Sequence, residues 1–333
     1  MAMTPRDVIK GNLNFTKPDR IGLAFDRKRL SDFCGAGIDT SLIWKKRMWV
    51  ENNKQFYDDA WGNLWYRIEG MSSGGEVHTP VLDTWDKLAT YKLPELDKPE
   101  LYVKTKERFA NAGDKYRLAS LPGFPFAICR YMRKLETYLG DLVLERENID
   151  ILHDRVTTLL EKVIKRMAEA GADGIFYCED WGTQERLLVS PDMWREIFKP
   201  LYKRLCKAAH DNGLHVLMHS CGYNWLILDD LAEVGVNAFQ FDQPELYGIE
   251  KLAEKLQKLH VCLYSPVDIQ KTMQTKDKTK IVAAANKMVD NFFGPNGGLI
   301  AKNYGDLKGI GITEEVDMWA YETFLARCQG LKK

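Results

Sequence analysis

The spacing of apolar and polar positions changes at residue 116, and from there it follows a repeated order. Short runs rich in apolar residues, such as 116–121 and 174–178, have the length of buried strands and end at polar or glycine-containing turns. Between them, apolar residues recur every three or four positions, as at Leu152, Val156 and Leu159, which is the spacing of one helix face. This alternation of strand and helix predicts a parallel sheet with helical crossovers.

The number of these strands predicts the architecture. One strand is expected at 21–26 and six more at 116–121, 174–178, 215–221, 237–242, 260–265 and 299–305. We expect an eighth strand before Asp141. Eight strand-helix units indicate an α/β fold of the (β/α)₈ TIM-barrel type. A doubly wound open sheet is disfavoured, because the chain has no G-x-G-x-x-G phosphate-binding loop.

Residues 1–115 are interpreted as a helical and hairpin extension of a single barrel domain that spans 1–333. Thr4 followed by Pro5 is typical of a helix start, and this helix is expected to run to about Asn14. Alternation over 62–68, with two glycines at 74 and 75, predicts a hairpin. The segment is rich in aromatic residues: Trp44, Trp49, Phe56, Tyr57, Trp61, Trp65 and Tyr66. These rings could form the core of a peripheral layer or a lid that lines a site for a flat ligand.

Composition restricts the partners and the compartment. The chain has 47 basic and 47 acidic residues in 333, so no net field favours nucleic acid or an anionic membrane. No apolar run reaches the length of a membrane span, and the N-terminus shows no secretory apolar region. Seven cysteines, an odd number without a regular framework, indicate reduced thiols. We therefore expect a cytoplasmic protein that binds neither nucleic acid nor membrane.

The stretch His215–Gly222 carries the most specific candidate chemistry. It is an apolar strand that ends in His219 and Cys221, and these two side chains point to the same side because a strand alternates its side chains. Imidazole nitrogen and thiolate sulfur are ligands that zinc prefers. By itself, His-x-Cys also fits a strand end with a core cysteine and a hydrogen-bonded histidine.

Polar residues follow several of the other expected strands. In TIM barrels, active sites lie at the carboxyl ends of the strands, so residues at these ends should share one mouth. They are Glu179, Asp180, His219, Cys221, Asp242, Gln243, Asp268, Asn303 and Tyr304. Each also has a structural interpretation, such as a cap at Asp180 or a loop hydrogen bond at Gln243. Cys262 lies early in its strand and is expected low in the barrel core.

A set of ordered motifs resembles the uroporphyrinogen decarboxylase superfamily. The motifs are Glu179–Gln184, Ser190–Trp194, Lys199–Pro200, His219–Gly222 and Gly235–Asn237. The resemblance covers most of the chain and is strongest over about 170–305. It implies a (β/α)₈ barrel and one of two activities, porphyrinogen decarboxylation or cobalamin-dependent methyl transfer.

The residues favour the methyltransferase group. Decarboxylases resemble one another in an N-terminal Arg-Gln-Ala-Gly-Arg element, whereas the corresponding part of this chain offers only Arg27–Arg29 and Lys45–Arg47. The methyltransferases bind zinc through His-x-Cys and a further cysteine after the final barrel strand. His219 and Cys221 match the first two ligands, but 299–305 contains no cysteine. The resemblance then implies zinc held by His219 and Cys221, with Glu179, Asp180 or Asp242 as the remaining ligand.

An oxygen-richer zinc site would be a harder Lewis acid, better suited to an ether or phenolate oxygen than to a thiol. The resemblance therefore implies an O-demethylase component that passes the methyl group of an aromatic methyl ether to the cobalt(I) of a partner corrinoid protein. Its expected catalytic residues are Glu179, Asp180 and His219, where Glu179 or Asp180 could instead donate a proton. The expected substrate-binding residues are Trp181, Asp242, Gln243, Asn303 and Tyr304, and Trp181 would sandwich the ring against the aromatic segment 44–66.

No Asp-x-His-x-x-Gly motif for corrinoid binding occurs, so the cobalamin should arrive on the partner protein. Two alternatives stay open: methyl transfer from a methylcorrinoid protein to a thiol, and non-enzymatic binding of a tetrapyrrole or small aromatic molecule.

Overall fold

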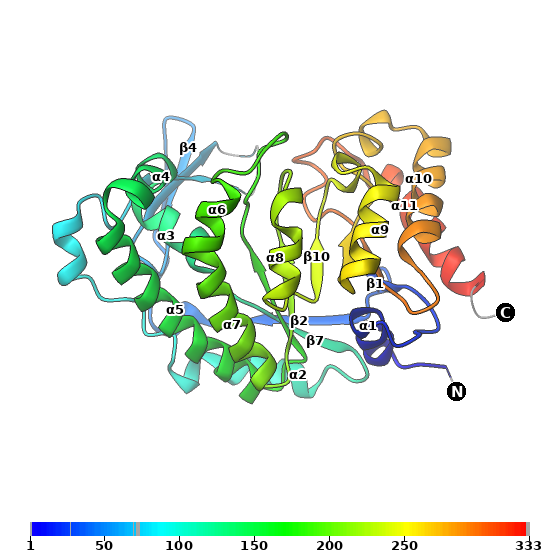
Figure 1. Cartoon of the computed structure of the whole chain (residues 1–333), viewed down its shortest axis with the longest axis horizontal. Helices are drawn as coiled ribbons and strands as arrows, with labels where there is room; N and C mark the ends of the chain where they lie inside the picture. The colour runs from blue at the N-terminus through cyan, green and yellow to red at the C-terminus, as the bar shows by residue number, and fades with distance from the viewer. Residues whose placement is uncertain (1, 27, 69, 71–73, 331–333) are drawn as a thin grey trace.

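A computed structural model describes residues 2–26, 28–68, 70 and 74–330, and eight of its strands form a nearly closed parallel barrel surrounded by helices (Figure 1). The barrel strands are β1 (Gly22–Ala24), β2 (Phe33–Gly37), β7 (Tyr116–Ser120), β8 (Gly174–Cys178), β9 (His215–His219), β10 (Ala238–Gln240), β11 (Cys262–Ser265) and β12 (Leu299–Lys302). Their order around the ring is β1-β12-β11-β10-β9-β8-β7-β2. The predicted (β/α)₈ fold is confirmed.

The eighth strand is β2, which precedes Asp141 as expected. Its sequence, Phe-Cys-Gly-Ala-Gly, has no apolar run that could have located it. The ring is joined between its two edge strands at Asp32, whose N–H donates to the Leu23 carbonyl at 2.8 Å. The Asp32 carboxylate accepts from the Leu23 N–H at 2.8 Å and from Arg20 at 2.7 Å. Asp32 therefore connects the edge strands β1 and β2 through both its backbone and its carboxylate.

Most of the helices lie in the connections between the barrel strands. The helices are α1 (Pro5–Asn14), α2 (Val103–Ala110), α3 (Pro125–Arg133), α4 (Leu135–Leu144), α5 (Arg146–Glu169), α6 (Pro191–Met193), α7 (Lys199–Asp211), α8 (Leu228–Glu233), α9 (Ile249–Leu259), α10 (Lys278–Phe292) and α11 (Glu314–Gly330). The helical segment after Ser190 is divided, because a π-helical turn at Trp194–Phe198 separates α6 from α7. Among the described residues, no helix has the length and apolarity needed to span a bilayer.

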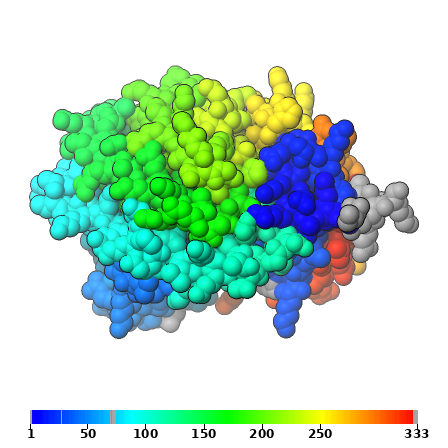
Figure 2. All heavy atoms as spheres, turned by 90° about the horizontal axis from the view of Figure 1, so that it is seen from below, coloured from blue at the N-terminus to red at the C-terminus, as the bar shows by residue number. Residues whose placement is uncertain are grey.

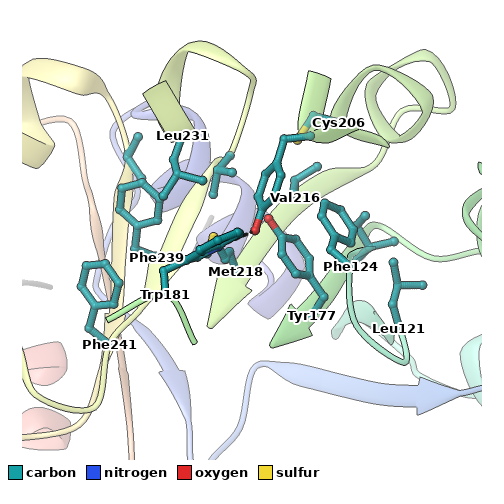
Figure 3. Close-up of a cluster of buried hydrophobic side chains, with 14 of the residues drawn as sticks. Leu121, Phe124, Tyr177, Trp181, Cys206, Val216, Met218, Leu231, Phe239 and Phe241 are labelled. Atoms are coloured by element: carbon teal, nitrogen blue, oxygen red, sulfur yellow. Dashed lines mark hydrogen bonds between the residues drawn. The ribbon is translucent and has the colours of Figure 1, made fainter. Parts of the chain in front are cut away.

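Side chains of the barrel strands alternate between two cores. Leu217 and Cys262 belong to the core inside the barrel, which Ile9 and Leu13 of α1 also join. Cys262 is fully buried there, as predicted. Tyr177, Val216, Met218 and Phe239 point the other way and pack between the strands and the helices (Figure 3). Odd and even positions of one strand therefore meet different surroundings.

The extension between β2 and β7 contains a four-stranded antiparallel sheet. Its strands, in spatial order, are β3 (Met48–Glu51), β4 (Lys54–Asp58), β5 (Leu64–Ile68) and β6 (Glu76–Thr79). The predicted hairpin is β5 with β6. Trp61 packs against the main core, and the ring centre of Trp65 lies 4.7 Å from that of Tyr131 in α3, so both rings pack the extension against the barrel.

A candidate metal centre at the mouth of the barrel

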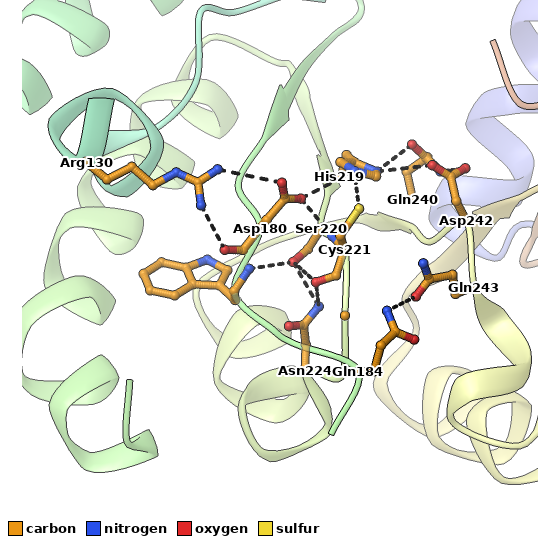
Figure 4. Close-up of polar contacts among 12 residues, drawn as sticks. Arg130, Asp180, Gln184, His219, Ser220, Cys221, Asn224, Gln240, Asp242 and Gln243 are labelled. Carbon is orange, nitrogen blue, oxygen red and sulfur yellow. Dashed lines mark hydrogen bonds and ion pairs between the residues drawn. The ribbon is translucent and has the colours of Figure 1, made fainter. Parts of the chain in front are cut away.

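The carboxyl ends of β8 and β9 bring three different donor groups together. Cys178 is level with His219 across the two strands, so Asp180 and Cys221, each two residues further on, extend to the same mouth. The His219 Nε2 atom lies 3.4 Å from Cys221 Sγ and 3.5 Å from Asp180 Oδ1 (Figure 4). One ligand atom from each of Asp180, His219 and Cys221 lies within 4.8 Å of the others.

The loops that follow these two strands are tied to each other. Cys221 N–H donates to Asp180 Oδ1 at 2.9 Å, and Tyr223 N–H donates to the Thr183 carbonyl at 2.7 Å. Gly222 has a φ of 79°, and a Cβ atom there would overlap the backbone of Gly182. The glycine after His-x-Cys is therefore required by the close approach of the two loops.

A buried chain of hydrogen bonds determines which nitrogen of His219 carries the proton. Gln240 Nε2 donates to Asp242 Oδ1 at 2.7 Å, and Lys302 Nζ lies 3.1 Å from the same oxygen. Because an ionised carboxylate only accepts, Gln240 must turn its amino group toward Asp242 and its oxygen toward His219. That oxygen lies 2.8 Å from His219 Nδ1. The proton is thus held at Nδ1, and the Nε2 lone pair faces Asp180 and Cys221.

Arg130 of α3 approaches Asp180 from the opposite side. Its Nη2 atom is 3.6 Å from Asp180 Oδ2, while Oδ1 of the same carboxylate faces His219. The buried guanidinium is held over the rings of Phe126 at 5.2 Å and Tyr131 at 4.9 Å. Arg130 therefore balances the charge of Asp180 and favours the orientation in which the Oδ1 atom faces His219 and stays available to a metal ion.

The donor set fits zinc. Burial raises the pKa of the Cys221 thiol well above its usual range, and the negative charges of Asp180 and Asp242 raise this pKa further. A divalent cation would offset these negative charges and favour the thiolate. One carboxylate oxygen, one imidazole lone pair and one thiol are all accepted ligands of zinc.

Glu179 lies outside this cluster, which corrects its expected role as a ligand beside His219 and Cys221. It is fully buried between the barrel wall and the helices. Its Oε1 accepts from the Ala127 N–H of α3 at 2.9 Å, and its Oε2 accepts from the Tyr202 hydroxyl. Burial raises the pKa of Glu179 to about 7, partly opposed by the Tyr202 hydrogen bond. The reason is alternation, since residue 179 points to the side opposite to residues 178 and 180.

Trp181 follows the same rule, so it does not line the mouth as expected for a substrate-binding residue. It is fully buried among the helices, 4.0 Å from the Phe126 ring (Figure 3). Its indole N–H donates to the Tyr202 hydroxyl at 2.8 Å. Trp181 is therefore part of the packing between the barrel and α3 and α7.

The other predicted residues divide between the cluster and the loops. Asp242 is buried, with one oxygen 3.9 Å from His219 Nδ1. Tyr304 is half-buried, and burial raises its pKa, as do the charges of Asp242 and Cys221. Gln243 accepts from Gln184 at 3.0 Å, which joins two loops at the rim.

Asn303 and Asp268 have structural contacts. Asn303 accepts from the Asp26 N–H at 3.1 Å, so it connects the end of β12 to the end of β1. Asp268 accepts from the backbone N–H groups of Glu245, Gln270 and Lys271 at 2.8–3.1 Å. These bonds order the loop after β11, away from His219.

Sequence reasoning missed three residues that contact the site. Gln240 precedes Asp242 by two positions, and Lys302 precedes Tyr304 by two, so strand alternation alone could have placed both at the mouth. Arg130 lies in a helix and carries no comparable signal.

Comparison with known proteins agrees with this fold. Residues 68–312 match the family described as uroporphyrinogen decarboxylase (URO-D), and the chain belongs to that family. Among solved structures, it is similar to a methyltransferase from Methanosarcina mazei, with a TM-score of 0.59, 16% identity, and coverage of 82% of this chain and 77% of that one. A B12-independent methionine synthase from Shewanella sp. W3-18-1 gives a TM-score of 0.48 at 11% identity, with coverage of 98% and 87%. A search of curated proteins finds no match.

Proposed function

We propose that this protein is a methyltransferase that takes the methyl group of an aromatic methyl ether and passes it to the cobalt(I) of a partner corrinoid protein. The observation that carries the proposal is the convergence of Asp180, His219 and Cys221 at the barrel mouth. Membership of the URO-D family and the fold similarity to the Methanosarcina mazei methyltransferase support it. The N-terminal arginine element of porphyrinogen decarboxylases is absent from the sequence, which argues against decarboxylation.

Asp180, His219 and Cys221 are the residues that would hold zinc. When bound, zinc supplies a Lewis acid that polarises the oxygen of the scissile bond. The surrounding residues prepare this site: Gln240 keeps the His219 proton at Nδ1, and Arg130 orients Asp180. A set with one thiol and one carboxylate is harder than a set with two thiols, which favours an oxygen substrate over a sulfur substrate.

The proposed reaction breaks the bond between the methyl carbon and the aryl oxygen and forms a bond from that carbon to cobalt. The electron pair of the broken bond stays on the oxygen, and the resulting phenolate then takes a proton from water. An aryl oxygen is a better leaving group than an alkoxide because the ring spreads its charge. Lys302 and Arg130 place positive charge near the mouth, where it would stabilise this developing anion.

Aromatic side chains other than Trp181 are available to contact the substrate ring. Tyr131 accepts a hydrogen bond from Arg130 at 3.0 Å and contacts Trp65 of the extension. Tyr304 follows β12, with its ring centre 5.9 Å from Lys302 Nζ. These rings support a site for a flat aromatic ether between the extension and the mouth.

The test combines the purified protein, its zinc content and a reduced corrinoid protein with a panel of methoxybenzenes. We expect the cobalt(I) absorbance to convert to that of methylcobalt(III), with the rate depending on zinc, and we expect the His219→Ala variant to be inactive. Absence of conversion with every methoxybenzene, together with turnover of a methylcorrinoid protein and a thiol, would instead establish thiol methylation. In the described part of the chain, none of the seven cysteines forms a disulfide, which supports a reducing compartment such as the cytoplasm.

A further inference from the structure

The two edges of the four-stranded sheet differ in how they meet solvent. The β6 edge carries Glu76 and His78, and its pairing with β5 is shifted by an irregularity between Leu64 and Trp65. Charged residues and bulges protect an exposed edge from pairing with another strand. The β3 edge instead presents Met48, Trp49 and Val50, which are 48%, 40% and 49% exposed. It has the features of an edge open to strand addition.

The backbone groups of β3 that point away from β4 can be identified. The β3-β4 hairpin turns through two residues at positive φ, Asn52 and Asn53, so Glu51 and Lys54 form the hydrogen-bonded pair that closes the turn. Hydrogen-bonded pairs alternate with non-bonded ones, so Trp49 bonds to β4 whereas Met48 and Val50 do not. Within the described chain, the N–H and C=O groups of Met48 and Val50 have no backbone partner.

We propose that β3 pairs with the β3 strand of a second copy of this chain, antiparallel and centred on Trp49. In this register, Met48 of one copy lies opposite Val50 of the other, so the free groups of both residues form hydrogen bonds. Arg47, whose guanidinium also pairs with Asp58 of its own sheet at 2.6 Å, then lies opposite Glu51 of the second copy at both ends of the strand pair. Registers centred on Met48 or Val50 use the same free groups but do not place Arg47 opposite Glu51: the first puts Lys45 opposite Glu51, and the second puts Trp49 opposite Glu51.

Trp49 provides the apolar contact. At the centre of the pair, the two Trp49 residues would form a non-hydrogen-bonded pair, the type in which side chains approach most closely. Each Trp49 ring already stacks on Phe56 of β4 at 5.5 Å, and Phe56 contacts His78 at 5.4 Å. The aromatic strip of one sheet would therefore continue into the strip of the other.

The location of the sheet permits this pairing. In Figure 2 the mid-blue residues of the extension lie at the periphery of the molecule, so a second copy could approach from outside. Five residues of each strand, 47–51, form a small interface, and we therefore expect a dimer whose population depends on concentration. The proposal is independent of the methyltransferase activity.

The first experiment measures the molar mass in solution as the protein concentration rises. Val50→Pro removes the N–H that would bond to the second copy, while the bonds from β3 to β4 remain. Val50→Thr is the matched control, because it keeps this N–H and a β-branched side chain. We expect the molar mass of wild type and of V50T to approach twice the 38.3 kDa chain mass. The dimer dissociation constant of V50P should be higher by about tenfold or more, and its circular dichroism spectrum should be unchanged. A wild type that stays monomeric to several hundred micromolar (about the upper end of weak association), or a V50P dimer as tight as that of V50T, would overturn the proposal.

The second experiment tests the register. Trp49→Cys places two thiols opposite each other in the centred pairing, at a separation that a disulfide can bridge. Glu51→Cys places them four residues apart along the strand pair and serves as the control, with wild type accounting for the native cysteines. We expect rapid intermolecular crosslinking of W49C alone under mild oxidation. Equal crosslinking of W49C and E51C would contradict the centred register.

Discussion

Glu179 and Asp180 are adjacent carboxylates with opposite surroundings. The Asp180 side chain is 40% exposed and faces His219 at the mouth, whereas Glu179 is fully buried on the helix side of the barrel wall. Glu179 accepts from the third residue of α3, Ala127, and α3 also carries Arg130, which contacts Asp180. One carboxylate therefore faces the proposed metal site, while its neighbour accepts a hydrogen bond from the helix that carries Arg130.

The largest effect is expected at Asp180. Asp180→Asn keeps the oxygen that accepts from the Cys221 N–H but removes the charged ligand atom, so zinc affinity and methyl transfer should fall by about 100-fold or more. Because this side chain is partly exposed, the unfolding temperature should change little. Zinc competition with a chelator and the cobalt assay measure the two losses. Retention of wild-type zinc affinity would exclude Asp180 from the ligand set.

The next effect is expected from Gln240. Gln240→Met keeps the volume but removes the acceptor at His219 Nδ1, so the imidazole tautomer is no longer fixed and zinc affinity should fall by about 10- to 100-fold. Nitrogen NMR of His219 should show a change in the protonated nitrogen before any metal is added. Gln243→Met is the matched control, because Gln243 bonds to Gln184 and should leave both measurements unchanged. Equal effects of the two variants would show that Gln240 acts only through general packing.

Glu179 should affect the pH dependence of stability. Its pKa rises from 4.5 to about 7 in the folded protein, so between these values the folded state keeps a proton that the unfolded state releases. The free energy of unfolding should therefore decrease as the pH rises through this window, by about 1.4 kcal/mol per pH unit. The Glu179→Gln side chain cannot titrate. The difference in the free energy of unfolding between wild type and E179Q should therefore be constant below pH 4.5 and should shrink with the same slope as the pH rises from 4.5 to about 7. A pH-independent difference would mean that Glu179 is ionised when buried.

The smallest effect is expected at Trp181. Trp181→Phe loses the hydrogen bond to Tyr202 and some packing, so the free energy of unfolding should fall by about 1–2 kcal/mol. Zinc affinity and the KM for a methyl ether should stay as in wild type, because this ring faces the helices. A raised KM with unchanged stability would return Trp181 to the mouth.

The sequence by itself determined the elements and the first pair of candidate ligands. Strand and helix periods predicted the barrel, Thr4-Pro5 predicted the start of α1, and strand alternation placed His219 and Cys221 on one side. These features are local, because each depends on residues a few positions apart. The glycine-rich β2 was not located, since its strand conformation comes from pairing with β7 rather than from its own composition.

Only the tertiary structure decided which carboxylate joins His219 and Cys221. Glu179 and Asp180 both follow β8, and the sequence does not show how far strand alternation continues beyond Cys178. The answer depends on the hydrogen bond from Cys221 to Asp180 and on the burial of Glu179 against α3. Likewise, Lys302 meets Asp242, 60 residues away, because β10 and β12 both pair in parallel with β11 and so end at the same mouth. Contacts between distant strands follow from ring order and register, which the packing of the whole chain sets.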